Sequence, residues 1–326
     1  MHRLNIVIVT PALADANNGN WQTAQRWARM LSAAHRVRLA AQWDGGDEAL
    51  MIALHARRSA AAVANWRAQR PSAPVVLVLT GTDLYRDIES DAAAQASLHS
   101  AHRLVVLNEL GAQALPAALR PKARVVLQSC AARRPLAKTP RHLRALMVGH
   151  LRDEKSPQTY FGATRLLAHR HDILLDHAGA ALQPALGAAA RALATQCPHY
   201  RWLGAVPHAN ARRRIQAAHV LVHPSRIEGG AHVVTEALRS GTPVVASHIA
   251  GNVGLLGAGY GGYFPVGDAA ALAALLQALR DDPSMLIKLR EQCQARAALF
   301  DPVHEAAALH KLLAELLAEL RAELRA

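Results

Sequence analysis

Two glutamates, Glu228 and Glu236, flank a glycine pair in the segment EGGAHVVTEALRSG. A strand-like run precedes it, Gly229 and Gly230 indicate a loop, and a helix is predicted over residues 231–240. The glycines would present backbone N–H groups at a helix N-terminus, which favours phosphate or hydroxyl oxygens. Because a helix rises ~1.5 Å per residue, the two carboxylates can contact one ligand at different depths.

The chemistry of this segment favours a ligand that carries both phosphates and sugars. A carboxylate repels phosphate, but it accepts hydrogen bonds from vicinal hydroxyls. A nucleotide sugar has both kinds of group. On the helix pattern alone, Glu236 could equally be an exposed residue without a ligand.

The elements that must position these residues alternate between short β-branched runs and Ala-rich stretches of helical length. This alternation predicts parallel sheets with right-handed crossovers, in which ligands bind beyond the carboxyl ends of the strands. The predicted strands are 4–10, 36–42, 50–54, 74–80, 103–108, 123–128, 144–149, 172–176, 200–205, 219–223 and 242–247.

A basic, Pro-containing segment without periodicity, residues 131–142, indicates a linker. We therefore expect two Rossmann-like α/β domains facing each other across a cleft. The domain over 136–305 would bind the nucleotide sugar, and the domain over 1–135 would bind the second substrate, the acceptor. Residues 306–326 are predicted to form an amphipathic helix that packs back on the body of the protein, with a homodimer interface as the alternative. The apolar face of this helix consists of Leu309, Leu312, Leu316, Leu320 and Leu324.

The composition of the chain limits the classes of binding partner that it favours. The net charge of +13 makes nucleic acid the first candidate, but the basic residues are mostly isolated and aromatics make up only 4% of the chain. Small anionic substrates are therefore favoured over nucleic acid. No apolar run approaches the ~18 residues of a membrane span. No secretory signal is evident, and three scattered cysteines favour a cytoplasmic protein.

The segment EGGAHVVTEA, together with GTPVVAS and GYFPVGD further on, resembles the Glu-x7-Glu motif of the GT-B glycosyltransferases that use nucleotide sugars. The resemblance implies that Glu228 contacts donor-sugar hydroxyls and that Glu236 holds the ribose diol. Gly230 lies where the family usually has Phe, and His232 where an apolar residue is common. His232 is therefore a candidate donor contact. The resemblance implies no essential metal or cofactor.

The segment GHLRDEKSP is similar to the family loop that follows the first strand of the nucleotide-binding domain. Lys155 matches the lysine that contacts the diphosphate. The expected arginine is replaced by His150. Because the leaving UDP needs a second cation, we assign Arg152 to that role, with a surface ion pair as the alternative.

The first half contributes two polar loops after predicted strands. Gly81, Thr82 and Asp83 follow the strand 74–80, and they suit a capped turn that presents polar groups to the acceptor. Many relatives have a histidine in this region, which Thr80-Gly81 replaces here. The loop after the first strand is rich in Asn and Gly. Its candidate residues for binding the acceptor and phosphate groups are Asn18, Gly19, Asn20 and Trp21.

These loops and GHLRDEKSP together resemble one branch of the family, the selenosugar synthases of bacterial selenoneine biosynthesis. The resemblance implies transfer of selenium from selenophosphate to C1 of a UDP-sugar such as UDP-N-acetylglucosamine or UDP-glucose, with Glu228, Asp83 and Lys155 as catalytic residues. UDP and phosphate would be released. The alternatives are a conventional glycosyltransferase with a lipid, polysaccharide or small hydroxyl acceptor, and a non-catalytic UDP-sugar-binding protein.

Overall fold

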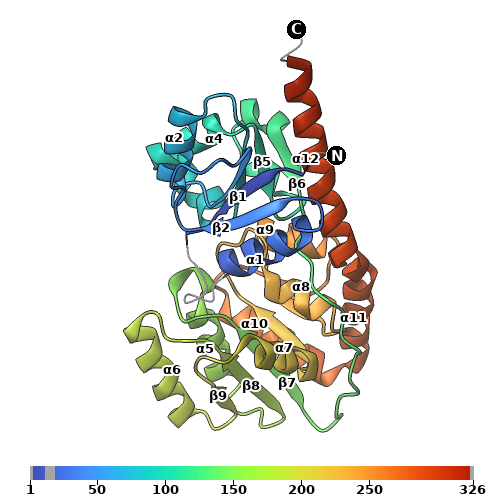
Figure 1. Ribbon diagram of the computed structural model, residues 1–326. Helices are drawn as coiled ribbons and strands as arrows, with labels where there is room; N and C mark the ends of the chain where they lie inside the picture. The colour runs from blue at the N-terminus through green and yellow to red at the C-terminus, as the bar shows by residue number, and fades with distance from the viewer. Residues whose placement is uncertain (1–2, 12–18, 324–326) are drawn as a thin grey trace. The chain divides into compact units, whose positions relative to one another are not determined.

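The computed structural model describes residues 3–11 and 19–323, which form two compact units (Figure 1). Unit 1 consists of Met1–Ser129, the loop Glu228–Gly230 and Pro302–Ala326. Unit 2 consists of Cys130–Ile227 and Ala231–Asp301. Each unit is built on one six-stranded parallel sheet, as the alternation in the sequence predicts.

The sheet of unit 1 has the strand order β2-β1-β3-β4-β5-β6, and every neighbouring pair is parallel. Its central strands are continuous apolar runs, which is typical of strands covered by helices on both faces. The strands are β1 Asn5–Val9, β2 Arg36–Ala40, β3 Leu50–Leu54, β4 Val75–Leu79, β5 Arg103–Val106 and β6 Ala123–Val125.

Two apolar cores lie on opposite faces of this sheet, one beneath α2 and α4 and the other beneath α1 and α12. Trp66 is the largest buried side chain of the first core, and Trp27 of the second. The helical elements of unit 1 are α1 Gly19–Leu31, α2 Ala60–Gln69, η2 Asp83–Asp87, α3 Ile88–Ser90, α4 Ala92–Ser100, η3 Gly111–Ala114, η4 Ala117–Lys122 and α12 Pro302–Glu323.

The helix α12 is fixed to unit 1 by leucines and by one buried carboxylate. Leu309, Leu312 and Leu316 are at most 3% exposed and belong to the apolar core on the α1 side of the sheet. The Glu305 carboxylate accepts hydrogen bonds from Trp27 Nε1 at 2.7 Å, from the Ser129 N–H at 2.8 Å and from the Arg26 guanidinium. Because the charge is paired and hydrogen-bonded, its burial is tolerated.

The sheet of unit 2 has the order β12-β11-β10-β7-β8-β9, again entirely parallel. The sequence predicts five of its strands but not β12, which has only two residues. The strands are β7 Leu143–Val148, β8 Ile173–Ala178, β9 Tyr200–Trp202, β10 Val220–His223, β11 Val244–Ser247 and β12 Tyr263–Phe264.

Helices flank both faces of this second sheet as well. They are η5 Asp153–Lys155, α5 Pro157–Leu166, α6 Pro184–Gln196, α7 His208–Ala217, α8 His232–Leu238, α9 Ala250–Leu256, α10 Ala269–Asp281, α11 Pro283–Ala297 and η6 Ala298–Phe300. None of the helices within residues 3–11 and 19–323 is long and apolar enough to cross a bilayer.

The segment predicted as a linker, residues 131–142, contains neither helix nor strand. Its first part is tied to the rest of unit 2 by backbone hydrogen bonds. The Arg133 N–H donates to Arg239 O at 2.8 Å, and Gln216 Nε2 donates to Arg134 O at 2.8 Å. The segment is therefore an extended connection held against unit 2.

Each sheet has a point at which the strand order reverses, and loops at such a point commonly bind ligands. In unit 1 the reversal lies between β1 and β3, so the residues after β3 flank it. In unit 2 it lies between β7 and β10, so the loop after β7 flanks it. These loops contain His55 in unit 1 and Arg152 and Lys155 in unit 2.

Candidate functional site

The loop after β7 in unit 2 presents two cations. Arg152 precedes the 3-10 turn η5 and Lys155 ends it, and Ser156 then adopts the left-handed region at φ 47° before α5 begins. The Arg152 Nε is a buried donor without a hydrogen-bond partner among the described residues. This donor therefore remains available for a ligand oxygen.

His150 has a structural contact in this loop. Its Nδ1 accepts the Ala180 N–H at 3.0 Å, so the ring ties the loop after β7 to the one after β8. Burial, together with the charges of Arg152 and Lys155, lowers the pKa of His150 below its ordinary value. The neutral ring does not supply the charge of the arginine that it replaces.

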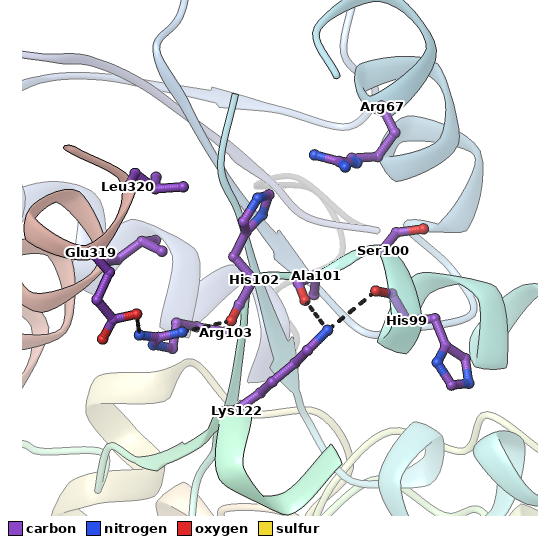
Figure 2. Close-up of a pocket in the computed structure, with 10 residues that line it drawn as sticks. Arg67, His99, Ser100, Ala101, His102, Arg103, Lys122, Glu319 and Leu320 are labelled. Atoms are coloured by element: carbon purple, nitrogen blue, oxygen red, sulfur yellow. Dashed lines mark hydrogen bonds and ion pairs between the residues drawn. The ribbon is translucent and has the colours of Figure 1, made fainter. Parts of the chain in front are cut away.

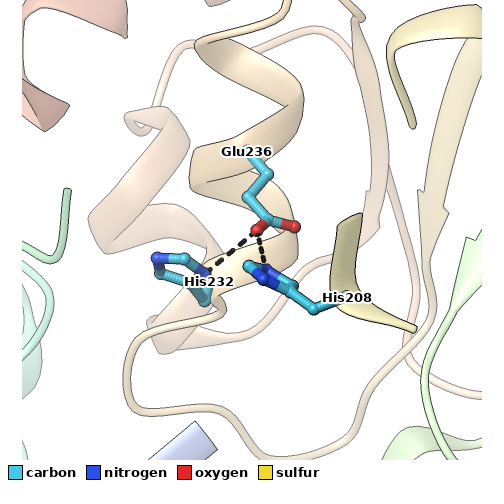
Figure 3. A group of neighbouring side chains, drawn as sticks. All are labelled: His208, His232 and Glu236. Atoms are coloured by element: carbon cyan, nitrogen blue, oxygen red, sulfur yellow. Dashed lines mark hydrogen bonds and ion pairs between the residues drawn. The ribbon is translucent and has the colours of Figure 1, made fainter. Parts of the chain in front are cut away.

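A second group of polar side chains surrounds Glu236 on α8 (Figure 3). His208 Nε2 lies 2.5 Å from Glu236 Oε1, and His232 Nδ1 lies 3.4 Å from the same oxygen. The Arg212 Nε is 3.6 Å away. Burial pushes the pKa of Glu236 upward, but hydrogen bonds from the two histidines outweigh it and lower that pKa to about 2. Glu236 is therefore a buried, ionised acceptor.

The histidines and Glu236 also form a set of possible metal ligands. Their ligand atoms all lie within 4.8 Å of one another. The Arg212 guanidinium next to the same carboxylate already balances its charge and opposes a second cation there. The donor set alone therefore does not favour a metal over the charge-assisted hydrogen bonds that the side chains already make.

In unit 1, the loop Glu228–Gly230 lies directly against Thr80 and Gly81. A Cβ on Gly229 would meet the Thr80 carbonyl at 2.5 Å, and one on Gly81, where φ is 141°, would meet the Gly229 nitrogen at 2.8 Å. Both positions therefore require glycine for the backbones to approach. Asn108 Nδ2 donates to Gly229 O at 2.7 Å and fixes the loop from the end of β5.

The Asp83 carboxylate organises the turn after β4. It accepts hydrogen bonds from the Thr80 and Gly81 N–H groups at 2.9 and 2.8 Å, and from the Ala56 N–H at 2.9 Å. Its side chain is fully buried. This geometry matches a turn-capping residue that shapes the loop, and Thr82 beside it remains partly exposed.

The loop after β1 is described only from its end onward. Asn18 lies outside the described residues, whereas Gly19, Asn20 and Trp21 form the first turn of α1. Gly19 is exposed, and a Cβ added there would meet no atom of the described residues within 4 Å. The Gly19 carbonyl accepts the Thr23 hydroxyl at 2.9 Å, which stabilises this turn.

Sequence reasoning overlooked two residues of this region, Asn108 and His55. Each comes directly after a buried strand or close to its end, a position that could have marked it. His55 adopts φ 74°, a left-handed conformation that is uncommon for residues other than glycine. Its Nε2 lies 3.1 Å from the Thr82 hydroxyl.

A pocket of about 330 Å³ lies elsewhere in unit 1 (Figure 2). It opens around the start of β5, whereas Thr82 and Asn108 follow the ends of β4 and β5. This pocket is therefore at the opposite edge of the sheet from the candidate site. It is lined by Arg67, His99, Ser100, Ala101, His102, Arg103, Lys122, Leu316, Glu319 and Leu320.

Comparison with solved structures places the chain in a known fold class. Sucrose-phosphate synthase from Thermosynechococcus elongatus superposes with a TM-score of 0.78 at 18% identity, over 97% of this chain and 100% of that one. HepE from Anabaena, solved in complex with UDP-glucose, gives 0.78 at 14% identity, over 96% and 100%. The fold is thus the predicted α/β, GT-B architecture of two Rossmann-like sheets.

The family of the chain follows from its sequence. The sequence profile of "Glycosyl transferases group 1" matches residues 131–300, and the chain belongs to that family. A stretch of 95 residues is 39% identical to D-inositol 3-phosphate glycosyltransferase 1 from Catenulispora acidiphila. That stretch covers 29% of this chain and 23% of the relative, so the likeness to that protein is local.

Proposed function

We propose that the chain is a glycosyltransferase whose donor is a UDP-sugar, such as UDP-N-acetylglucosamine or UDP-glucose. The main support is Glu236, a buried carboxylate with a pKa of about 2 on a helix within the region that matches the family. An ionised acceptor of this kind suits the vicinal hydroxyls of a ribose. The HepE structure with UDP-glucose is consistent with that donor class.

The donor would be bound by residues with distinct tasks. Lys155 and Arg152 would neutralise the diphosphate, and the unpartnered Arg152 Nε supplies one hydrogen bond for it. Glu228 would accept from the sugar hydroxyls, and Gly229 and Gly230 would let its loop pack closely against Thr80 and Leu107. His232 would lie next to the ribose through its contact with Glu236.

We further propose selenophosphate as the acceptor, the reaction of a selenosugar synthase. Selenium would attack C1 of the sugar while the C1–O bond to UDP breaks, and Lys155 would stabilise the charge on the departing UDP. Water would then cleave the P–Se bond. The balanced products are a 1-selenosugar, UDP and phosphate. Thr82 and the 18–21 loop would hold the acceptor, and Gly81 and Asp83 would shape the turn that carries Thr82.

Calorimetric titration with UDP tests the donor site. Glu236→Ala should weaken UDP binding by about ten-fold or more, because the ribose loses a charged acceptor worth about 1.5–3 kcal/mol. Glu291→Ala, on an exposed position of α11 in the same unit, is the matched control and should leave binding unchanged. Equal affinities for the wild type and the Glu236 variant would exclude the ribose role.

The reaction itself is tested by incubating UDP-N-acetylglucosamine with selenophosphate under anaerobic conditions. UDP release and a selenium-containing sugar in the mass spectrum are expected, and Glu228→Ala should lower the turnover. UDP release only with an alcohol acceptor would support a conventional glycosyltransferase instead. Tight UDP binding without release under either condition would indicate a non-catalytic binding protein.

A further inference from the structure

His55 is held in an unusual conformation at the carboxyl end of β3. A left-handed backbone costs a non-glycine residue roughly 1–2 kcal/mol, so its surroundings must impose it. They do so through two backbone hydrogen bonds, from the His55 N–H to Val78 O at 2.8 Å and from the Ser59 N–H to His55 O at 3.0 Å. The ring is 2% exposed and points to Thr82.

The contacts of the ring define its tautomer. The Arg58 N–H donates to His55 Nδ1 at 3.3 Å, so Nδ1 carries the lone pair and Nε2 carries the hydrogen. Burial lowers the pKa of His55, against the opposing effect of the Asp83 and Asp87 carboxylates. Arg57 and Arg58 lower the pKa further, and no other charged neighbour contributes among the described residues. The ring is therefore neutral at pH 7.

This tautomer determines what Thr82 can do. His55 Nε2–H donates to the Thr82 hydroxyl oxygen at 3.1 Å. Thr82 does not cap the helix that follows it, and its hydroxyl has no other hydrogen-bond partner among residues 3–11 and 19–323. The hydroxyl hydrogen therefore remains available, and the partly exposed Thr82 presents it to a ligand as a donor.

Neither Asp83 nor His55 is free to act as a general base. Asp83 has a fully buried side chain, and its oxygens accept the N–H groups of Ala56, Thr80 and Gly81. His55 has its single lone pair occupied by Arg58. An alcohol acceptor benefits from a base that removes its proton, whereas an acceptor that is already anionic needs donors and positive potential.

We propose that His55 is a positioning residue that fixes Thr82 as a hydrogen-bond donor, and that Thr82 forms a subsite for an anionic, phosphate-type acceptor. The proposal rests on the proposed function, because it defines the acceptor class of that same site. Arg57, 45% exposed, and the exposed Arg58 add positive potential beside it. Selenophosphate has the required oxyanion, and a neutral alcohol does not.

The test compares four variants in steady-state kinetics with selenophosphate and UDP-N-acetylglucosamine. His55→Asn removes the ring while keeping a residue that tolerates the left-handed backbone. Thr82→Val removes the hydroxyl at constant shape, and Thr82→Ser restores it. His102, a half-buried histidine of unit 1 just before β5, gives the matched control His102→Asn.

The expected result is a rise of about ten-fold or more in the acceptor KM of His55→Asn and Thr82→Val, with the donor KM unchanged. Thr82→Ser should recover most of that loss, and His102→Asn should show none. Equal rises in both KM values, or an unchanged acceptor KM in both variants, would overturn the proposal. Turnover of a neutral alcohol by a wild-type enzyme that does not bind inorganic phosphate would also overturn it.

Direct binding of inorganic phosphate separates this proposal from the proposed function. Calorimetry should show phosphate binding to the wild-type chain that is weakened in Thr82→Val and retained in Thr82→Ser. If selenophosphate is not turned over but this pattern holds, only the proposed function fails. If phosphate binds equally to Thr82→Val and the wild type, the subsite itself is refuted.

Discussion

At the residue scale, the close approach of Gly229 to the backbone of Thr80 and Gly81 is a tight steric constraint in unit 1. Gly229→Ala would place a methyl group 2.5 Å from the Thr80 carbonyl, so one of the two loops must move. Overpacking of this kind destabilises by about 1–3 kcal/mol. We expect a lower melting temperature in calorimetry and a lower turnover.

Gly259→Ala is the control for that substitution. A Cβ at Gly259 would meet nothing within 4 Å, so neither the melting temperature nor the turnover should change beyond the small effect of a surface substitution. Equal melting temperatures for the two variants would contradict the contact between the loops.

A second prediction at this scale concerns Gly19, where a substitution should affect turnover more than stability. It is exposed at the start of α1, and a Cβ there would meet none of the residues that the structure describes, so Gly19→Val should hardly alter stability. If the loop approaches the ligand, the branched side chain should impair turnover. A variant that lost only melting temperature would show that the position is part of a simple turn.

At the element scale, α12 depends on one buried ion pair. Glu305→Ala would remove the carboxylate that pairs with Arg26, whose side chain is 16% exposed, and that accepts hydrogen bonds from Trp27 and Ser129. Breaking a buried pair typically costs about 3–5 kcal/mol. Urea unfolding should show this loss. Lys311 and Glu315 form an exposed pair on the same helix, and Lys311→Ala should change stability by less than about 0.5 kcal/mol.

The same scale shows what the sequence could and could not predict. The eleven predicted strands are present because buried parallel strands are continuous apolar runs, whereas the two residues of β12 are too few for any pattern. Glu228 and Glu236 stand out through their spacing around glycines. His55 does not, because its conformation and its contact with Thr82 arise only when β3 and β4 pair.

At the scale of the whole molecule, stability should fall below neutral pH. Burial lowers the pKa of His177 to about 4, whereas an unfolded histidine titrates near 6.5. The unfolded chain therefore binds the extra proton first, so this contribution is lost as the pH falls below ~6.5 and levels off below ~4. Linkage gives about 2 kcal/mol of lost stability at pH 5 relative to pH 7.5.

Urea unfolding at the two pH values tests this dependence. His177→Gln should remove much of the difference, whatever its effect on stability at pH 7.5. Exposed His169→Gln should retain the full wild-type dependence. A pH dependence of equal size in all three proteins would mean that groups other than His177 cause it.

The position of α12 in unit 1 has a consequence for synthesis on the ribosome. Multidomain chains generally fold from the N-terminus first. Here the sheet β1–β6 leaves the ribosome without the helix that covers one of its faces, because Pro302–Glu323 follows all of unit 2. At a synthesis rate of ~5–20 residues per second, that face remains uncovered by α12 for roughly ten to forty seconds. Unit 2 can therefore complete its fold before unit 1, and the apolar surface that α12 later covers is exposed on the nascent chain in the meantime.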